Sequence, residues 1–207
     1  MNDAIAELRA CCAGHCGVWA RIGSGYATKN AGIFFMPEIQ DEVILSFINN
    51  DPSFPVILGS LYSSQQAAPF TPDEKNTNKA IVTNAQLKIT MDDDKKIIQI
   101  RTPGGHIVTL SDDKQSITIV DSNSNKLEMS SAGIALTSAT DIKLKATGEI
   151  SLEAQTNVGI KAGMNLDVEG LNVNAKASVA FSAQGQAKAE MTASGQVTVR
   201  GAMVMIN

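Results

Sequence analysis

The chain of 207 residues is poor in aromatic side chains, which make up 4% of it, although its hydrophobic content of 43% is ordinary. Small residues take the places that large rings would fill, so the composition favours a narrow core. No uninterrupted apolar run approaches the ~18–20 residues of a membrane-spanning helix. The formal net charge of −4 offers no attraction for phosphates, so we expect no nucleic-acid partner.

Histidine and cysteine, which most often bind metals or act as nucleophiles, are equally scarce. The three cysteines and one of the two histidines fall together, as Cys11, Cys12, His15 and Cys16. An odd, tightly clustered set is a poor disulfide framework, and three thiolates with an imidazole suit zinc. Adjacent cysteines rarely point at one metal, however, so free thiols are favoured over a metal site. We expect no cofactor, no resident metal and no enzyme activity.

The first seven residues contain Asp3 and Glu7 where a secretory signal would have a basic start and an apolar stretch. The sequence therefore predicts no signal peptide. We expect the chain to be made and assembled in the cytoplasm, so that any later release requires an export machine.

What the sequence has in abundance is an eight-residue repeat in its C-terminal half. Two large apolar residues spaced two apart recur once in every octad, so both leave the same face of a strand. The strict pairs are Ile134 and Leu136, Ile142 and Leu144, Ile150 and Leu152, Val158 and Ile160, and Leu166 and Val168, and later pairs stand at 197 and 199 and at 204 and 206. A short strand and a short turn, repeated in phase, predict a β-solenoid with these pairs as its core.

The repeat also controls residue size. The next position on the inward face is small, as in Ala146 and Ala154, whereas outward positions are polar, as in Lys143. An ordinary sandwich does not keep such a phase over five strands. A single thin chain buries little, and three chains wound about one axis would solve that problem. We therefore predict an intertwined trimeric β-helix over residues 96–207, with a single-chain solenoid as the alternative.

The N-terminal part follows another pattern. Strand-length apolar runs at 18–22, 32–36, 42–47 and 55–62 are bounded by Gly, Pro, Asn or Asp, which predicts a small antiparallel barrel over residues 1–63. Residues 5–9 are the one segment that admits a helix. Residues 64–95 are predicted to be a linker followed by the first irregular strands.

Two motifs in this part carry a family resemblance. The run Pro-Glu-x-x-Asp-Glu-Val at residues 37–43 and the run Asp-Pro-x-x-Pro-Val-x-Leu-Gly-Ser at residues 51–60 follow Trp19. Together they closely resemble the OB-fold of the valine-glycine repeat (VgrG) spike family. That family includes spikes of type VI secretion systems, contractile phage tails and extracellular injection particles. The end of the chain, residues 201–207, looks like the family's spike terminus.

The resemblance implies an all-β homotrimer, an OB-fold followed by a β-helical spike, that sits at the tip of a contractile tube. It implies a membrane-piercing role, ejection with the injection particle, and five kinds of partner. These are other copies of the chain, a PAAR-type tip protein, tube and hub proteins, effector cargo and the target cell envelope. The predicted tip platform is Met203, Val204, Met205, Ile206 and Asn207, with a last core octad as the equal alternative.

The chain departs from the family pattern at its start. A hub domain and the opening OB strands usually precede the tryptophan, whereas 18 residues precede Trp19, so we expect a partial OB barrel. Two other functions stay open. A phage tail fibre or adhesin shaft shares the physics of the rod. A polysaccharide-degrading solenoid would need clustered acids, for which residues 92–94 and 112–113 are the candidates, although solvated turn acids are favoured.

Overall fold

The computed structural model describes residues 5–9 and 17–205 of the chain, and almost all of its regular structure is β-strand. Its one helical element within those ranges is the short 3-10 turn Ile48–Asn50. The all-β class predicted from the sequence is therefore confirmed. Among the described residues, no helix combines the length and the apolar character of a membrane span. The chain divides into a unit of residues 1–144 and a unit of residues 145–207.

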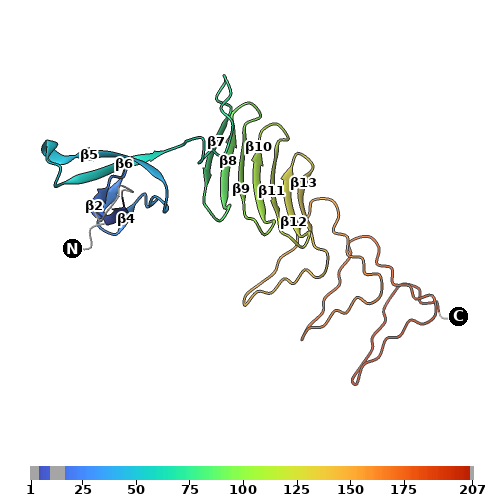
Figure 1. Cartoon of the computed structure of the whole chain (residues 1–207). Helices are drawn as coiled ribbons and strands as arrows, with labels where there is room; N and C mark the ends of the chain where they lie inside the picture. Colours follow the sequence, from blue (N-terminus) through green and yellow to red (C-terminus); the bar gives the residue numbers. More distant parts are fainter. Residues whose placement is uncertain (1–4, 10–16, 206–207) are drawn as a thin grey trace. The chain divides into compact units, whose positions relative to one another are not determined.

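The N-terminal domain is built on a four-stranded sheet in the order β1-β2-β6-β5 (Figure 1). Its strands are β1 Ile5–Arg9, β2 Gly17–Ile22, β5 Glu42–Phe47 and β6 Pro55–Leu61. Strands β2 and β6 run parallel, and the other neighbours are antiparallel. Ala20 and Ile57, from this central pair of strands, are the apolar side chains buried within the described part of the chain.

Two local expectations for this domain are wrong. Residues 5–9 form β1 instead of a helix, because their backbone pairs with β2, with Ile5 opposite Arg21. The expected strand at 32–36 is reduced to β4, Ala31–Gly32, which pairs with β3, Ala27–Thr28. These two short strands form a tight hairpin, in which the Ile33 N–H donates a hydrogen bond to the Tyr26 carbonyl oxygen at 2.9 Å.

The next part of the chain is a seven-stranded antiparallel meander, drawn from green to yellow in Figure 1. Its strands are β7 Asn78–Val82, β8 Lys88–Asp92, β9 Ile97–Arg101, β10 Ile107–Ser111, β11 Ser116–Val120, β12 Lys126–Ser130 and β13 Gly133–Thr137. The sheet begins inside the segment for which the sequence predicts a linker and irregular strands. Each strand has five residues and pairs with its sequence neighbour, so every contact between strands is local.

Each hairpin of this meander reverses through a residue with positive φ. These residues are Gln86, Lys96, Gly105, Gln115, Ser124 and Gly133. Positive φ is what lets two strands joined by a short loop turn back side by side with the right twist. The regular supply of such residues explains why the chain folds back on itself six times.

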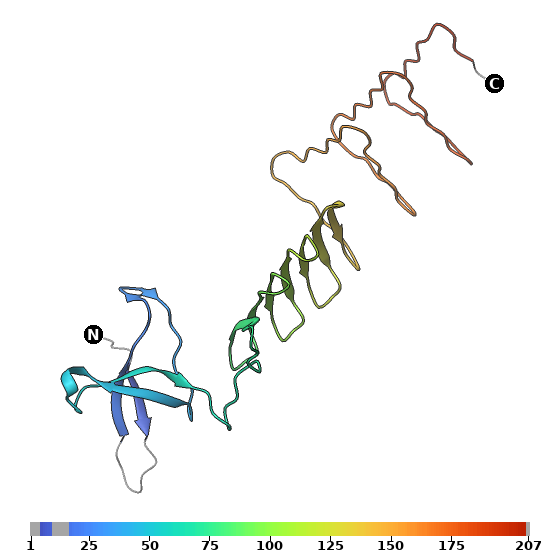
Figure 2. The same cartoon turned by 90° about the horizontal axis from the view of Figure 1, so that it is seen from above.

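Beyond Thr137 the chain stops reversing and winds in wide, open turns that carry no strand (Figures 1 and 2). The backbone bends sharply at 139–140, 147–148, 155–156, 163–164, 171, 178–179, 186–187, 194–195 and 202. Six-residue segments separate these bends, so the octad of the sequence is also the period of the backbone. Within residues 134–205 no residue has positive φ, which is consistent with corners instead of reversals.

A small polar network marks the change from meander to winding chain. The Asp121 carboxylate accepts hydrogen bonds from the backbone N–H groups of Asn123 and Asn125, each at 2.8 Å, and from the Asn125 side-chain amide at 2.8 Å. The amide oxygen of Asn125 in turn accepts from the Ser138 hydroxyl at 2.7 Å and the Ala139 N–H at 3.3 Å. The loop after β11 therefore holds the residues that follow β13.

The tight hairpin at Gly32 gives the first prediction. Gly32 has φ +151, and a Cβ there would lie 2.6 Å from the Tyr26 carbonyl oxygen. Gly32→Ala should therefore lower the free energy of unfolding by about 1–3 kcal/mol. Urea unfolding followed by the fluorescence of Trp19 measures it. Gly25→Ala is the matched control, because nothing lies within 4 Å of its added Cβ. Equal effects of the two changes would contradict the prediction.

The second prediction concerns Asp121. The hydrogen bond from the Asn125 side chain is the main cause that lowers the pKa of the Asp121 carboxyl. Its contribution to stability is therefore complete above the ordinary aspartate pKa of about 4 and is lost as pH falls through the lower folded pKa. Asp121→Ala should speed amide hydrogen exchange at residues 121–125 and 138–139 at neutral pH. Asp113→Ala should leave that exchange unchanged; protection retained in Asp121→Ala would refute the network's role.

Candidate assembly surface

One face of the β7–β13 sheet carries two continuous apolar ladders. Paired residues on neighbouring strands line up across the sheet, and residues two apart on a strand share a face. The first ladder runs from Met91 through Ile98, Leu110, Ile117 and Met129 to Ile134, with the charged Lys79 at its β7 end, and the second is Ile81, Ile89, Ile100, Val108, Ile119, Leu127 and Leu136. Seven strands at ~4.8 Å spacing make each ladder about 30 Å long.

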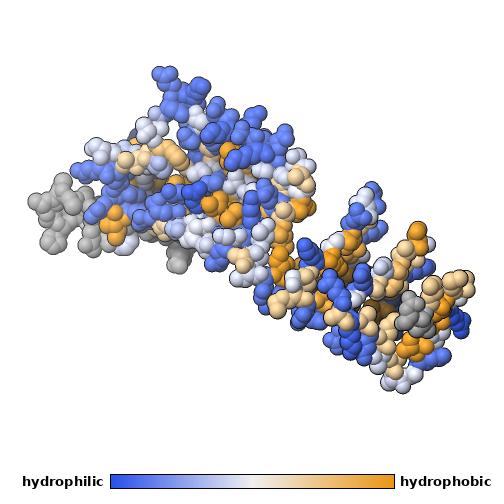
Figure 3. Space-filling model, turned by 90° about the vertical axis from the view of Figure 1, so that its right-hand side faces the viewer, coloured by the Kyte–Doolittle hydropathy of each residue, from blue (hydrophilic) through white to orange (hydrophobic). Residues whose placement is uncertain are grey.

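These ladders are open to solvent in the single chain. Ile98, Ile100 and Leu110 are each more than two fifths exposed, although they occupy the middle of the sheet. Figure 3 shows apolar side chains, in orange, standing at the surface among hydrophilic ones. Monomeric proteins rarely expose continuous apolar surface of this extent. The apolar face is therefore a surface built to be covered.

The opposite face of the same sheet is more polar. Its middle ladder runs through Thr90, Gln99, Thr109, Thr118 and Glu128. The Gln99 side chain donates to the Thr109 hydroxyl at 3.1 Å. The ladders on either side of it mix polar residues with Ile97, Ile107 and Val120. The two faces of the sheet therefore differ, and the continuous apolar ladders lie on one of them.

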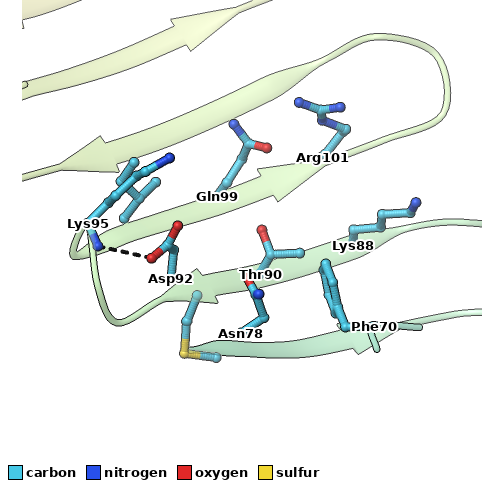
Figure 4. A pocket seen from close by; sticks show the side chains of 10 residues that line it. Phe70, Asn78, Lys88, Thr90, Asp92, Lys95, Gln99 and Arg101 are labelled. Carbon is cyan, nitrogen blue, oxygen red and sulfur yellow. Dashed lines mark hydrogen bonds between the residues drawn. The ribbon is translucent and has the colours of Figure 1, made fainter. Parts of the chain in front are cut away.

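An open depression of about 390 Å³ lies on the polar face, and Phe70 forms one of its walls (Figure 4). Lys88 and Arg101 face each other across β8 and β9, and within the described ranges neither takes part in an ion pair. The Asp92 carboxylate accepts hydrogen bonds from the N–H groups of Asp94 and Lys95 at 3.0 and 2.9 Å, so it caps its own turn. Asp92 is the one acidic side chain among the residues that line the depression.

The predicted spike core falls into two places. Ile134 and Leu136 lie on β13, at the ends of the two ladders. The other eight residues lie in the winding segment, each pair in one six-residue stretch between bends: Ile142, Leu144, Ile150, Leu152, Val158, Ile160, Leu166 and Val168. All of them are exposed in the single chain.

The winding segment also leaves its backbone unpaired. Within residues 140–205, no backbone N–H donates to a backbone carbonyl, and no strand ladder joins one turn to the next. Polar backbone groups that lack protein partners must stay hydrated or be paired by another chain. Apolar octads and unpaired backbone therefore lie on the same segment.

The bends reveal octads that the sequence pattern alone does not. Counting from the single-residue bend at Leu171, the inward pairs continue in phase as Val173 and Ala175, Phe181 and Ala183, Ala189 and Met191, and Val197 and Val199. Alanine weakens the signal, and the seven-residue step from Leu166 to Val173 breaks the strict period. The repeat is therefore continuous from Gly133 to the last described residues.

The predicted tip residues follow the bend at Ala202. Val204 is 52% exposed, whereas Met203 and Met205 are 79% and 77% exposed, so Val204 points to the other side of the backbone from the two methionines. Ile206 and Asn207 lie outside the described residues, as do Cys11, Cys12, His15 and Cys16. Among the residues that the structure describes, no group of three or more His, Cys, Asp or Glu could hold a metal ion.

Comparison with known proteins concerns the N-terminal domain. Residues 8–62 match the model of the type VI secretion system/phage-baseplate injector OB domain. Those residues contain the β2–β6 parallel pair and the whole of β3 to β6. The domain is therefore an OB domain of the injector class.

The relatives that share this domain are spike proteins. The chain is 40% identical over 52 residues to the type VI secretion system spike protein VgrG1a of Pseudomonas aeruginosa, which is 25% of this chain and 8% of that protein. It is 38% identical over 58 residues to the spike protein VgrG3 of Vibrio cholerae, which is 28% of this chain and 6% of the relative. Over its OB domain, the chain is similar to these VgrG-type spike proteins.

A third relative carries an activity in its name. The actin cross-linking toxin VgrG1 of Vibrio cholerae is 35% identical over 65 residues, which are 31% of this chain and 6% of the toxin. In all three relatives, the aligned segment is less than a tenth of the relative's length. The similarity is confined to the OB domain, so the toxin's activity does not transfer with it.

Proposed function

We propose that the chain is the spike of a contractile injection apparatus and that it works as a homotrimer, in which the β7–β13 sheets of three copies pack about one axis and residues 138–205 wind into a three-sided β-helix. The observation that carries this proposal is the winding segment, which bends once per octad yet makes no backbone–backbone hydrogen bonds of its own. In a single-chain solenoid, successive turns would lie ~4.8 Å apart and pair directly. Open turns leave room for strands of other copies.

Copies of the same chain are the fitting partners for these turns. A repeat of constant length presents the same strand, corner and apolar pair at every level, so a second copy offset by one octad meets an equivalent strand. The number of copies in the proposed assembly, three, is taken from the resemblance to the VgrG family. Three apolar faces of β7–β13 packed about one axis would cover the two ladders of each copy and leave the polar faces outside.

A completed structure of this kind suits penetration of an envelope. Continuous pairing removes exposed strand edges, and a dry centre of Ile, Leu and Val gives stiffness at a small cross-section. The injector OB domain supports attachment to the apparatus. We further propose that tube and hub proteins bind at the OB end, that a PAAR-type protein caps residues 203–207, and that the assembly carries effector cargo. Assembly would take place in the cytoplasm before ejection toward the target envelope.

The alternatives receive less support. A tail fibre or adhesin shaft fits the β-helix, but the injector OB domain favours the spike. A polysaccharide-degrading solenoid would need its acids free for chemistry. Asp92 caps its own turn, and Asp93 forms an ion pair with Lys79. The acids of this turn therefore have structural roles, as expected for hairpin loops.

The mass in solution tests the proposal first. The full chain of 21.8 kDa should elute and scatter as three copies, about 65 kDa, at all concentrations above the micromolar range. Sedimentation equilibrium or light scattering measures this directly. A monomer with folded residues 140–205 would overturn the homotrimer.

The next prediction places a charge in the proposed core. Leu144→Asp would bury three carboxylates at one level of the trimer, and each unpaired charge costs several kcal/mol, so assembly should fail. Lys143→Ala is the matched control, because the Lys143 side chain is 85% exposed and its ammonium forms an ion pair with the Asp141 carboxylate at 3.5 Å. Size-exclusion chromatography with light scattering separates the outcomes. A Leu144→Asp trimer with unchanged melting would refute the inward assignment.

A further inference from the structure

The corners of the winding segment carry a second pattern, separate from the inward pairs. The last residue of each bend is the corner position, and in chain order these residues are Thr140, Gly148, Thr156, Met164, Leu171, Val179, Ala187, Gly195 and Ala202. Three consecutive corners therefore have large apolar side chains, and the corners on either side are small or polar.

These three side chains are almost fully exposed in the single chain. Met164, Leu171 and Val179 are 94%, 101% and 99% exposed, whereas the eight pair residues from Ile142 to Val168 are 50–70% exposed. A single exposed apolar residue is ordinary in proteins and needs no explanation. Three in succession at one position of a repeat form a pattern of their own, distinct from the octad pairs.

The proposed trimer brings these corners together. This step rests on the homotrimeric β-helix proposed above. In a three-sided helix of three chains, each octad moves the chain to the next edge and up by one strand spacing. Each edge therefore displays Met164 of one copy, Leu171 of a second and Val179 of the third, about 5 Å apart from level to level.

We propose that Met164, Leu171 and Val179 form an interchain apolar clasp on each of the three edges of the spike. The occupant of each exposed corner is the corner residue of another copy. Side chains at this spacing contact as cross-strand neighbours do, and methionine adapts its shape to fill the end of the column. The clasp ties all three chains together outside the core, at the level where the octad shortens by one residue at Leu171.

Disulfide trapping tests the geometry. In a chain whose own cysteines are replaced, Cys11→Ser, Cys12→Ser and Cys16→Ser, the pair Met164→Cys and Leu171→Cys puts two thiols of different copies within disulfide range. Mild oxidation with diamide should link three chains into one covalent band on a denaturing gel. The matched pair Met164→Cys and Val179→Cys lies two levels apart, about 10 Å, and should stay unlinked.

Stability tests the energetic role. Changing the three corners together to serine should lower the melting temperature of the trimer by roughly 5–10 °C. Serine at the flanking corners Thr140, Thr156 and Ala187 should change it by less than about 2 °C. Met164→Ser and Leu171→Ser should be non-additive in their effects on melting, because their side chains touch across copies.

The outcomes separate this inference from the proposed function. A wild-type chain that is monomeric removes the trimer itself. The clasp is overturned if the wild-type chain is a trimer but the Met164→Cys, Leu171→Cys variant does not cross-link. It is also overturned if the triple serine variant has the same melting temperature as the wild type. In both cases the proposed spike still stands.

Discussion

The structure depends on one constraint, which is that residues 140–205 form no backbone–backbone hydrogen bonds with the described part of the same chain. A segment of this length cannot leave both its polar backbone and its apolar octads in water and still hold a defined shape. The exposed ladders of β7–β13 present the same demand as a surface. Association with other copies of the same chain would pair the free backbone of the winding segment and cover the apolar ladders of the sheet.

The meander and the winding segment solve the problem of turning in different ways. Every reversal of the meander has one residue with positive φ, as at Gln115 and Gly133. The winding segment turns at bends that contain no residue with positive φ, so its six-residue segments continue forward instead of folding back beside the preceding one. The Asp121, Asn125 and Ser138 network stands at the point where one mode gives way to the other.

The sequence predicted the repeat well because large residues at a spacing of two are hard to mistake. It missed the pairs around Phe181 and Met191, because alanine replaces one member and the step at Leu171 shifts the phase. Residues 5–9 formed a strand because pairing with β2 outweighed local preference. The injector OB domain was recognisable from its turn motifs, whereas the sequence pattern alone did not show that residues 164, 171 and 179 occupy the same position at successive bends.

The local pairing of the meander has a consequence for how the spike is built. Each strand of β7–β13 meets its sequence neighbour, so the sheet has low contact order and can form inside one chain before copies meet. In the proposed trimer, the winding segment would gain its backbone hydrogen bonds only after association. Three preformed sheets would then set the starting register, and pairing of the octads after Thr137 would proceed from the sheets toward the C-terminus. The octad repeat by itself would allow neighbouring copies to pair one octad out of register. The β7–β13 sheet, which does not wind, would hold the copies in the correct register.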